Sequence, residues 1–258
     1  MLYYPNNTLT HYTTRLANAI SLTGEWEVGL VEIQYQHSWS NLEKMEGRFT
    51  YLQMGKSVDD KPRSSMTRTL RLSPGYYETP SDLVDSINVL IKEAACGGKY
   101  ESYPRFTYNP ITKRLNADLS AMSRVNFSPT LCSMLGIGSR QNPIENEDDD
   151  SNWDWKGTNA CDINRGFSSM YVYCNVLEHV SVGDTKAPLL RIVRVTEKGG
   201  QTVNTIYEKP LYVPLQLKTF DSLEIDIRSD TGNPIPFEYG KVIVTLHFRR
   251  CKIPYHLQ

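Results

Sequence analysis

The segment SLEIDIRSDTGNPIPFEYGKVIVTLHFRR, residues 222–250, decides the fold class, because it reads as two strands joined by a turn. Side chains at every second position of a strand share one face. One face of the second strand is apolar and consists of Val242, Val244, Leu246 and Phe248. The opposite face consists of Ile243, Thr245, His247 and Arg249. That face is a catalytic surface, the floor of a ligand site, a wall against another subunit, or a face whose side chains pack on their cross-strand neighbours within the sheet.

Alternating strands extend over most of the chain. In residues 25–35, EWEVGLVEIQY, the apolar parity changes near Gly29, which predicts either a β-bulge or a strand covered on both faces. From residue 167 onward the sequence is nearly all strand, punctuated by turn residues. This pattern predicts an all-β fold, an antiparallel sandwich or jelly roll.

A middle segment interrupts the strands. Thr79, Pro80 and Asp82 have the spacing of a capping box, and they precede an apolar stripe at helical spacing. A β-hairpin is predicted over 105–120, and a short helix runs from Ser128 to Gly136. A long acidic loop then fills most of 138–166. We therefore expect a sandwich formed by 1–77 and 167–258, with 78–166 as an insertion.

Composition excludes several classes of function. A net charge of −1 gives no general attraction to nucleic acid or to an anionic membrane, and no stretch is long and apolar enough to span a bilayer. Five cysteines at irregular spacings form no CxxC pair. The N-terminal sequence lacks the pattern of a signal peptide. We expect an intracellular protein that folds without disulfides and binds no nucleic acid.

No motif in the sequence indicates catalysis. The five histidines form no HxH, HExxH or HxxxH pair, so no metal site and no cofactor are expected. Residues 148–159 resemble a calcium loop, but Trp153 stands where that loop needs glycine. Trp153 and Trp155 lie in the acidic loop, 145–156. They either pack back onto the domain or anchor a partner.

Several collinear blocks resemble one family. They include YPNNTLTHYTTRLANAISLTGEWEVGLVEIQY (4–35), HSWSNL (37–42) and PGYYETPSDLVDSINVLI (74–91). The later blocks are FSPTLCSMLGI (127–137), INRGFSSMYVYCNVLEHVSVGDTKAPLLRIVRV (163–195) and YVPLQLKTFDSLEIDIRSDTGNPIPFEYGKVIVTLHFRR (212–250). Together they cover most of the chain. The sequence resembles the minor capsid, or penton, protein of Polinton (Maverick) elements and of the related adintoviruses.

The resemblance implies a single jelly roll without enzymatic activity. It also implies homopentamers at the fivefold vertices of an icosahedral shell, next to a double jelly-roll major capsid protein. The protein would then be a virion component that is intracellular before assembly. On this reading Tyr171, Tyr173, Ile243 and His247 are predicted to lie at the subunit interface.

A carbohydrate- or receptor-binding β-sandwich is the alternative. The loop that carries Trp153 and Trp155 would form the binding site, and the partner would be a host receptor or a glycan. The two functions can coexist, because a vertex protein is exposed. A jelly-roll enzyme of the cupin type would need clustered histidines, which the spacing does not favour.

Overall fold

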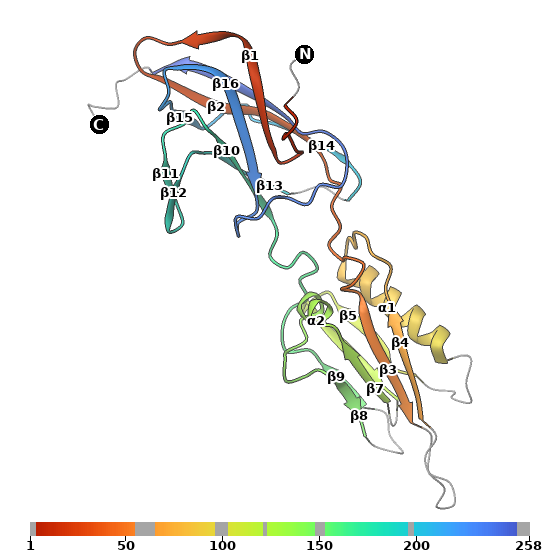
Figure 1. Cartoon of the computed structure of the whole chain (residues 1–258). Helices are drawn as coiled ribbons and strands as arrows, with labels where there is room; N and C mark the ends of the chain where they lie inside the picture. The colour runs from red at the N-terminus through yellow and green to blue at the C-terminus, as the bar shows by residue number, and fades with distance from the viewer. Residues whose placement is uncertain are drawn as a thin grey trace, which may run out of the picture. The chain divides into compact units, whose positions relative to one another are not determined.

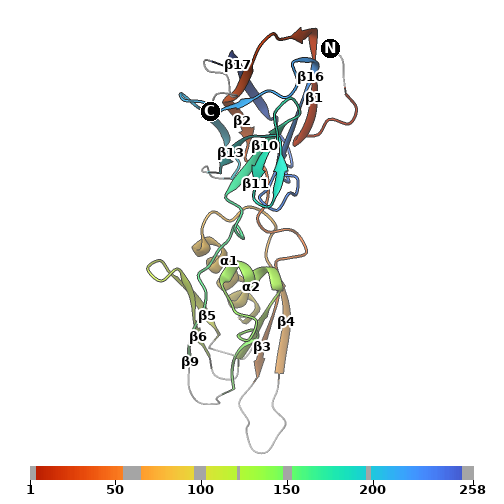
Figure 2. The ribbon, with the colours of Figure 1, turned by 90° about the vertical axis from the view of Figure 1, so that its left-hand side faces the viewer.

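In a computed structural model the chain forms two compact units, Met1–Trp39 with Phe167–Gln258 (unit 1) and Ser40–Gly166 (unit 2) (Figure 1). The structure describes residues 4–54, 65–95, 103–120, 123–147, 153–195 and 199–251. Both units are rich in antiparallel strands, and the two α-helices lie in unit 2 (Figure 2).

Sheet A of unit 1 has four antiparallel strands in the order β1-β16-β10-β13. Their bounds are β1 His11–Ser21, β16 Thr219–Arg228, β10 Ser169–Cys174 and β13 Leu189–Arg194. Strand β10 alternates cleanly, with Met170, Val172 and Cys174 buried and the residues between them half-buried. This alternation defines an inner face toward the core and an outer face.

Sheet B of unit 1 is built around β2 (Trp26–Gln36). Strand β17 (Ile243–Arg250) pairs with nearly the whole length of β2. Strands β14 (Thr202–Ile206) and β15 (Tyr212–Pro214) pair with opposite ends of β2, so they share its other side. Sheet B is therefore three strands wide. A separate hairpin is formed by β11 (Val180–Val182) and β12 (Thr185–Ala187).

A β-bulge explains the parity change in β2. Thr245 of β17 pairs with Glu32, and the next residue, Leu246, pairs with Leu30. Val31 is thus the extra residue on β2. The bulge lies two residues after Gly29, and it lets both halves of β2 turn their apolar residues inward. The sheets join through the interior, where the rings of Phe220 and Phe248 stack with centroids 5.9 Å apart.

The expected boundary at residue 77 differs from the structure. Strand β3 (Arg48–Met54) pairs with β4 (Ser65–Arg71) and with β7 (Ser123–Phe127), so all three belong to unit 2. The reason is packing, because Phe49 is buried and stacks on Phe127 with ring centroids 5.5 Å apart. A local strand pattern predicts a strand but does not say which sheet it joins.

Unit 2 holds a four-stranded sheet in the order β4-β3-β7-β8, with β8 at Ile144–Asn146. A second sheet consists of β5 (Arg105–Asn109), β6 (Arg114–Leu119) and β9 (Trp153–Lys156). The predicted hairpin is therefore present as β5 and β6. The predicted long loop is only partly right, because β8 and β9 lie within it. Residues 148–152 of the acidic loop lie outside the described residues.

Helices α1 (Pro80–Ala95) and α2 (Pro129–Leu135) complete the core of unit 2. The capping box of α1 is confirmed, since the Thr79 amide donates to Asp82 Oδ2 at 2.9 Å and the Asp82 amide donates to Thr79 Oγ1 at 3.2 Å. Helix α2 begins after Ser128, whose hydroxyl accepts from the Leu131 amide, and ends at Gly136 in the left-handed conformation. Helix α1 begins, and helix α2 begins and ends, as the sequence predicts. The predicted end of α1 at Gly97 and Gly98 lies outside the described residues.

Candidate functional site

The outer face of sheet B combines exposed apolar side chains with uncharged polar ones. Ile243 of β17 is 49% exposed and lies opposite Gln34 of β2, which pairs on its other side with Asn204 of β14. One row along, Thr245 lies opposite Glu32, which pairs with Ile206. Ile206 is 63% exposed. This face therefore presents two isoleucines to solvent beside polar side chains, one of which, Glu32, is charged.

His247 is part of a cluster at the next row of the same face. His247 and Tyr212 both pair with Gly29, one from each side, and His247 Nδ1 lies 2.9 Å from the Tyr212 hydroxyl. The Arg249 guanidinium stacks 3.4 Å above the Tyr212 ring and pairs with the buried carboxylate of Glu27. The cluster ties three strands together across the outer face.

Gly29 makes this cluster possible. A Cβ at this position would lie 3.0 Å from the backbone oxygen of Leu211 and 3.3 Å from the Tyr212 ring. The missing side chain leaves room for the tyrosine and histidine to meet above the sheet. His247 is thus engaged by its own subunit.

Tyr171 and Tyr173 lie on the outer face of sheet A. Tyr171 pairs with Arg228 and Ile192, and Tyr173 pairs with Asp226. The structure therefore does not bring the four predicted interface residues together. Two lie on the outer face of sheet A and two on that of sheet B, because the tyrosines and the β17 residues belong to different sheets. Whether any of them contacts a second copy stays a prediction.

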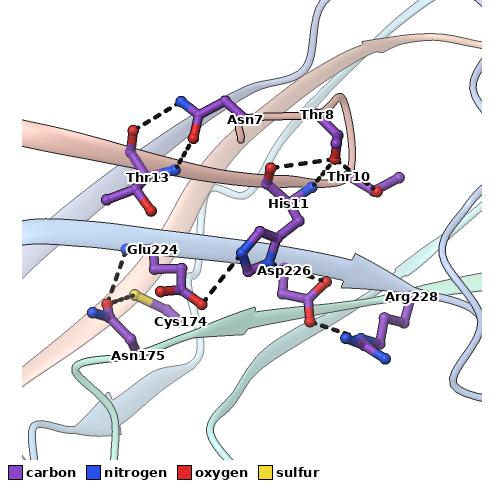
Figure 3. A network of polar contacts seen from close by, with 10 residues as sticks. All are labelled: Asn7, Thr8, Thr10, His11, Thr13, Cys174, Asn175, Glu224, Asp226 and Arg228. Carbon is purple, nitrogen blue, oxygen red and sulfur yellow. Dashed lines mark hydrogen bonds and ion pairs between the residues drawn. The ribbon is translucent and has the colours of Figure 1, made fainter. Parts of the chain in front are cut away.

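The outer face of sheet A also carries a polar network (Figure 3). The His11 ring lies between two carboxylates, with Nε2 at 3.6 Å from Glu224 and Nδ1 at 3.8 Å from Asp226. Arg228 Nε donates to Asp226 Oδ2 at 2.7 Å. Asn175 Oδ1 accepts from the Glu224 amide at 3.0 Å. These contacts join β1, β16 and the end of β10.

The side chain of Asn7 caps the edge of sheet A. Its Nδ2 donates to the Thr13 carbonyl at 3.0 Å, and its Oδ1 accepts from the Thr13 amide at 2.9 Å (Figure 3). A side-chain amide here makes the hydrogen bonds that a further strand would make. Edge strands left uncovered invite pairing with other chains. This part of β1 is therefore closed.

Burial raises the pKa of three thiols among the described residues, those of Cys132, Cys161 and Cys174. Cys132, Cys161 and Cys174 are free thiols. Burial raises the pKa of Cys161 and of Cys174 to about 11, so neither is a thiolate at neutral pH. Within the described residues no three His, Cys, Asp or Glu side chains gather as a metal site. In the same residues no helix has the length and hydropathy for a membrane span.

The two tryptophans have different environments. Trp155 is 6% exposed and packs in the core of unit 2, opposite Ala117. Trp153 is 50% exposed and borders a shallow hollow of about 580 Å³. Charged side chains line the same hollow, namely Arg140, Glu145, Asp154 and Lys156. Trp155 thus packs back onto its domain, and Trp153 is available to a ligand.

Three residues that the sequence reasoning did not single out are prominent in the structure. Ile206 and Leu211 are 63% and 64% exposed at the connection of β14 and β15. Tyr12 of β1 turns its hydroxyl into the protein, where it has no hydrogen-bond partner among the described residues. Burial raises the pKa of this hydroxyl. For Ile206 and Leu211 the sequence signal was a pair of apolar residues on either side of a connection that contains the polar Glu208 and Lys209.

Comparison with known proteins identifies the fold. No family model and no curated protein matches the chain. Among solved structures, the crystal structure of the selenomethionine-labelled mavirus penton protein aligns with a TM-score of 0.50 at 10% sequence identity. The alignment covers 93% of this chain and 90% of that one. The chain therefore has the fold of a penton jelly-roll protein, and the predicted fold class is confirmed.

Proposed function

We propose that this chain is a structural minor capsid, or penton, protein that forms homopentamers at the fivefold vertices of an icosahedral shell. The observation that carries the proposal is the extent of the likeness to the mavirus penton protein, which covers 93% of the chain and thus both units. The resemblance of the sequence blocks to Polinton and adintovirus proteins supports the same reading.

The outer face of sheet B supports self-association. Scattered apolar residues are normal on a protein surface. Here Ile206 and Ile243 lie on neighbouring rows of one face, amid Gln34, Asn204, Thr245 and the charged Glu32. Burial of the apolar part of this face contributes roughly 25 cal/mol for each Å², against which the desolvation of Glu32 has to be set. In a cyclic ring it would meet a different patch of the next copy.

The proposal implies further partners and a location. The neighbours of the pentamer are copies of a double jelly-roll major capsid protein, and the protein resides at the capsid vertex after an intracellular stage before assembly. It performs no catalysis. The raised thiol pKa values of Cys161 and Cys174 agree with this, because buried thiols of this kind are inert.

Two measurements test the proposal. Native mass spectrometry of the purified chain over a range of concentrations should detect pentamers. Coexpression with a double jelly-roll major capsid protein of the same element should give shells whose fivefold positions carry this chain in cryo-electron microscopy. A chain that remains monomeric in solution and is absent from the vertices of such shells would contradict the proposal.

Binding of a receptor or glycan is a second function, favoured by one observation. The half-exposed Trp153 borders a hollow that is otherwise lined by charged and polar groups, as in sites where a sugar stacks on an aromatic ring. A glycan array probed with the wild type and with Trp153→Ala tests it. Ile111→Ala is the matched control, because Ile111 is also exposed in unit 2. Equal binding by all three proteins would reject this function.

A further inference from the structure

The two sheets of unit 1 differ in width, and the difference leaves one edge of the sandwich open. Sheet A has four strands, whereas sheet B is three strands wide. A hollow of about 470 Å³ lies where β1 and β16 face β17. Most of its lining is apolar and comes from Leu223, Ile225, Val244, Leu246 and Phe248. Strand β1, at the edge of sheet A, thus extends past β17, the edge strand of sheet B.

Burial along sheet B shows that this edge is incompletely covered. On β2 the inward side chains of Val28 and Leu30 are fully buried. On the adjoining β17 the inward Leu246 and Phe248 remain half-exposed, although they lie on the same face of the same sheet. Within the described ranges β17 pairs only with β2, so its other edge is free. An uncovered apolar strand at a sheet edge is a site for pairing or packing.

Tyr12 of β1 also contributes to the lining of the hollow. Its ring lines the hollow, and its hydroxyl is buried without a hydrogen-bond partner among the described residues. A buried hydroxyl that lacks a partner is costly, and such groups call for an explanation. Because this hydroxyl is shielded from solvent inside the protein, it lies out of reach of an occupant of the hollow, and only the ring would contact one.

The opposite edge of sheet B carries an exposed apolar projection, the Ile206–Leu211 connection. Ile206 and Leu211 flank the connection between β14 and β15 and are the most exposed large apolar residues of unit 1 within the described ranges. The connection is held in place, because the Tyr207 amide donates to the Val31 carbonyl at 2.7 Å and Arg191 stacks 3.5 Å above the Tyr207 ring. A fixed apolar projection loses little entropy on binding.

We propose that the Ile206–Leu211 connection of one copy packs into the hollow between β1 and β17 of the next copy. The proposal rests on the homopentamer proposed above and names its contact surfaces. The hollow and the projection lie at opposite edges of sheet B, so the contact is heterologous. A row of copies joined in this way has a free hollow at one end and a free projection at the other. The ring closes when this last hollow and projection meet.

Variants of the two surfaces test this contact. The projection variant is Ile206→Asp with Leu211→Asp, and both residues are exposed, so the fold should survive. The hollow variant is Thr14→Arg, because Thr14 lines the hollow and is itself exposed. Each should raise the concentration for half-maximal pentamer formation by at least about 100-fold. Ile111→Asp in unit 2 is the control and should leave pentamers intact. Circular dichroism and the melting temperature check that each variant is folded.

Mixing the two variants gives a sharper result. The projection variant has an unchanged hollow, and the hollow variant has an unchanged projection. Each alone should be monomeric, whereas an equimolar mixture should form 1:1 dimers that grow no further, as read by native mass spectrometry. A contact in which both copies used the same patch would not give this outcome.

The outcomes separate this proposal from the proposed function. A wild type that forms pentamers while either variant does so equally well overturns the contact but leaves the penton function standing. The hollow would then be filled by another occupant, such as terminal residues of the same chain. If each variant alone is monomeric but the mixture forms no dimer, the contact is also overturned. A wild type that is monomeric in solution and missing from shell vertices overturns both.

Discussion

Unit 2 has a closed core, whereas unit 1 is closed in its centre and open along one edge. In unit 2 both sheets and both helices bury their inward side chains, including Phe49, Leu115 and Leu131. In unit 1 the inward residues of β2 are equally buried, but those of β17 are not. Unit 2 thus buries its inward side chains throughout, whereas unit 1 leaves apolar surface exposed along one edge.

The largest effect is expected in the closed core. Leu115→Ala removes a fully buried side chain from unit 2 and should lower the free energy of unfolding by about 3 kcal/mol, because a cavity adds to the lost transfer energy. Urea denaturation followed by circular dichroism measures the loss. A value below about 1 kcal/mol would show that unit 2 can relax around the cavity and is less tightly packed than its burial indicates.

Thiol chemistry tests whether the centre of unit 1 is as closed as unit 2. Cys174 in unit 1 and Cys161 in unit 2 both have a pKa raised by burial to about 11 from an ordinary value of 9.0. At pH 8 the thiolate fraction of each should be about 100-fold below that of an ordinary cysteine. Mass spectrometry of alkylated peptides should show slow labelling of both. Fast labelling of Cys174 alone would mean that the open edge admits solvent to the centre.

The open edge itself should tolerate truncation. Leu246→Ala removes a half-buried side chain that borders the hollow, so the monomer should lose only about 1 kcal/mol of unfolding free energy, well below the loss at Leu115. Urea denaturation under conditions that keep the chain monomeric compares the two. An equal loss at the two sites would remove the distinction between the open edge and the closed core.

The smallest effect is expected on the outer face of sheet B. His247→Ala removes the contact with the Tyr212 hydroxyl and should lower the free energy of unfolding by about 0.5–1 kcal/mol. Asn204→Ala, at an exposed position of the same face, is the control and should change it less. If the histidine variant matches the control, the cluster above Gly29 contributes nothing measurable to the stability of unit 1.

Local patterns predicted local structure well. Thr79 and Asp82 identified the start of α1, and Ser128 and Gly136 identified both ends of α2, because capping depends on residues within one turn of the chain. The parity change near Gly29 correctly indicated an irregular strand. The fold class followed from many such strands and from the resemblance of long sequence blocks.

What the sequence could not give was the pairing of distant segments. Residues 48–71 alternate like strands of either unit, and only the burial of Phe49 against Phe127 decides where they lie. Tyr171 and Ile243 both look like exposed positions on strands, yet they belong to different sheets. The open edge is also a long-range property, since it depends on how many strands each sheet holds. The sequence of a short segment does not show how many strands each sheet holds.

Two aromatic rings mark where unit 2 joins unit 1. Trp39 is the last residue of unit 1 before unit 2, and Phe167 is the first after it. Their rings meet edge to face with centroids 5.6 Å apart. A short turn in place of residues 40–166 would therefore span the junction without distorting the sandwich. Unit 2 is in this sense a cassette, inserted between two neighbouring positions of the β-sandwich that carries it.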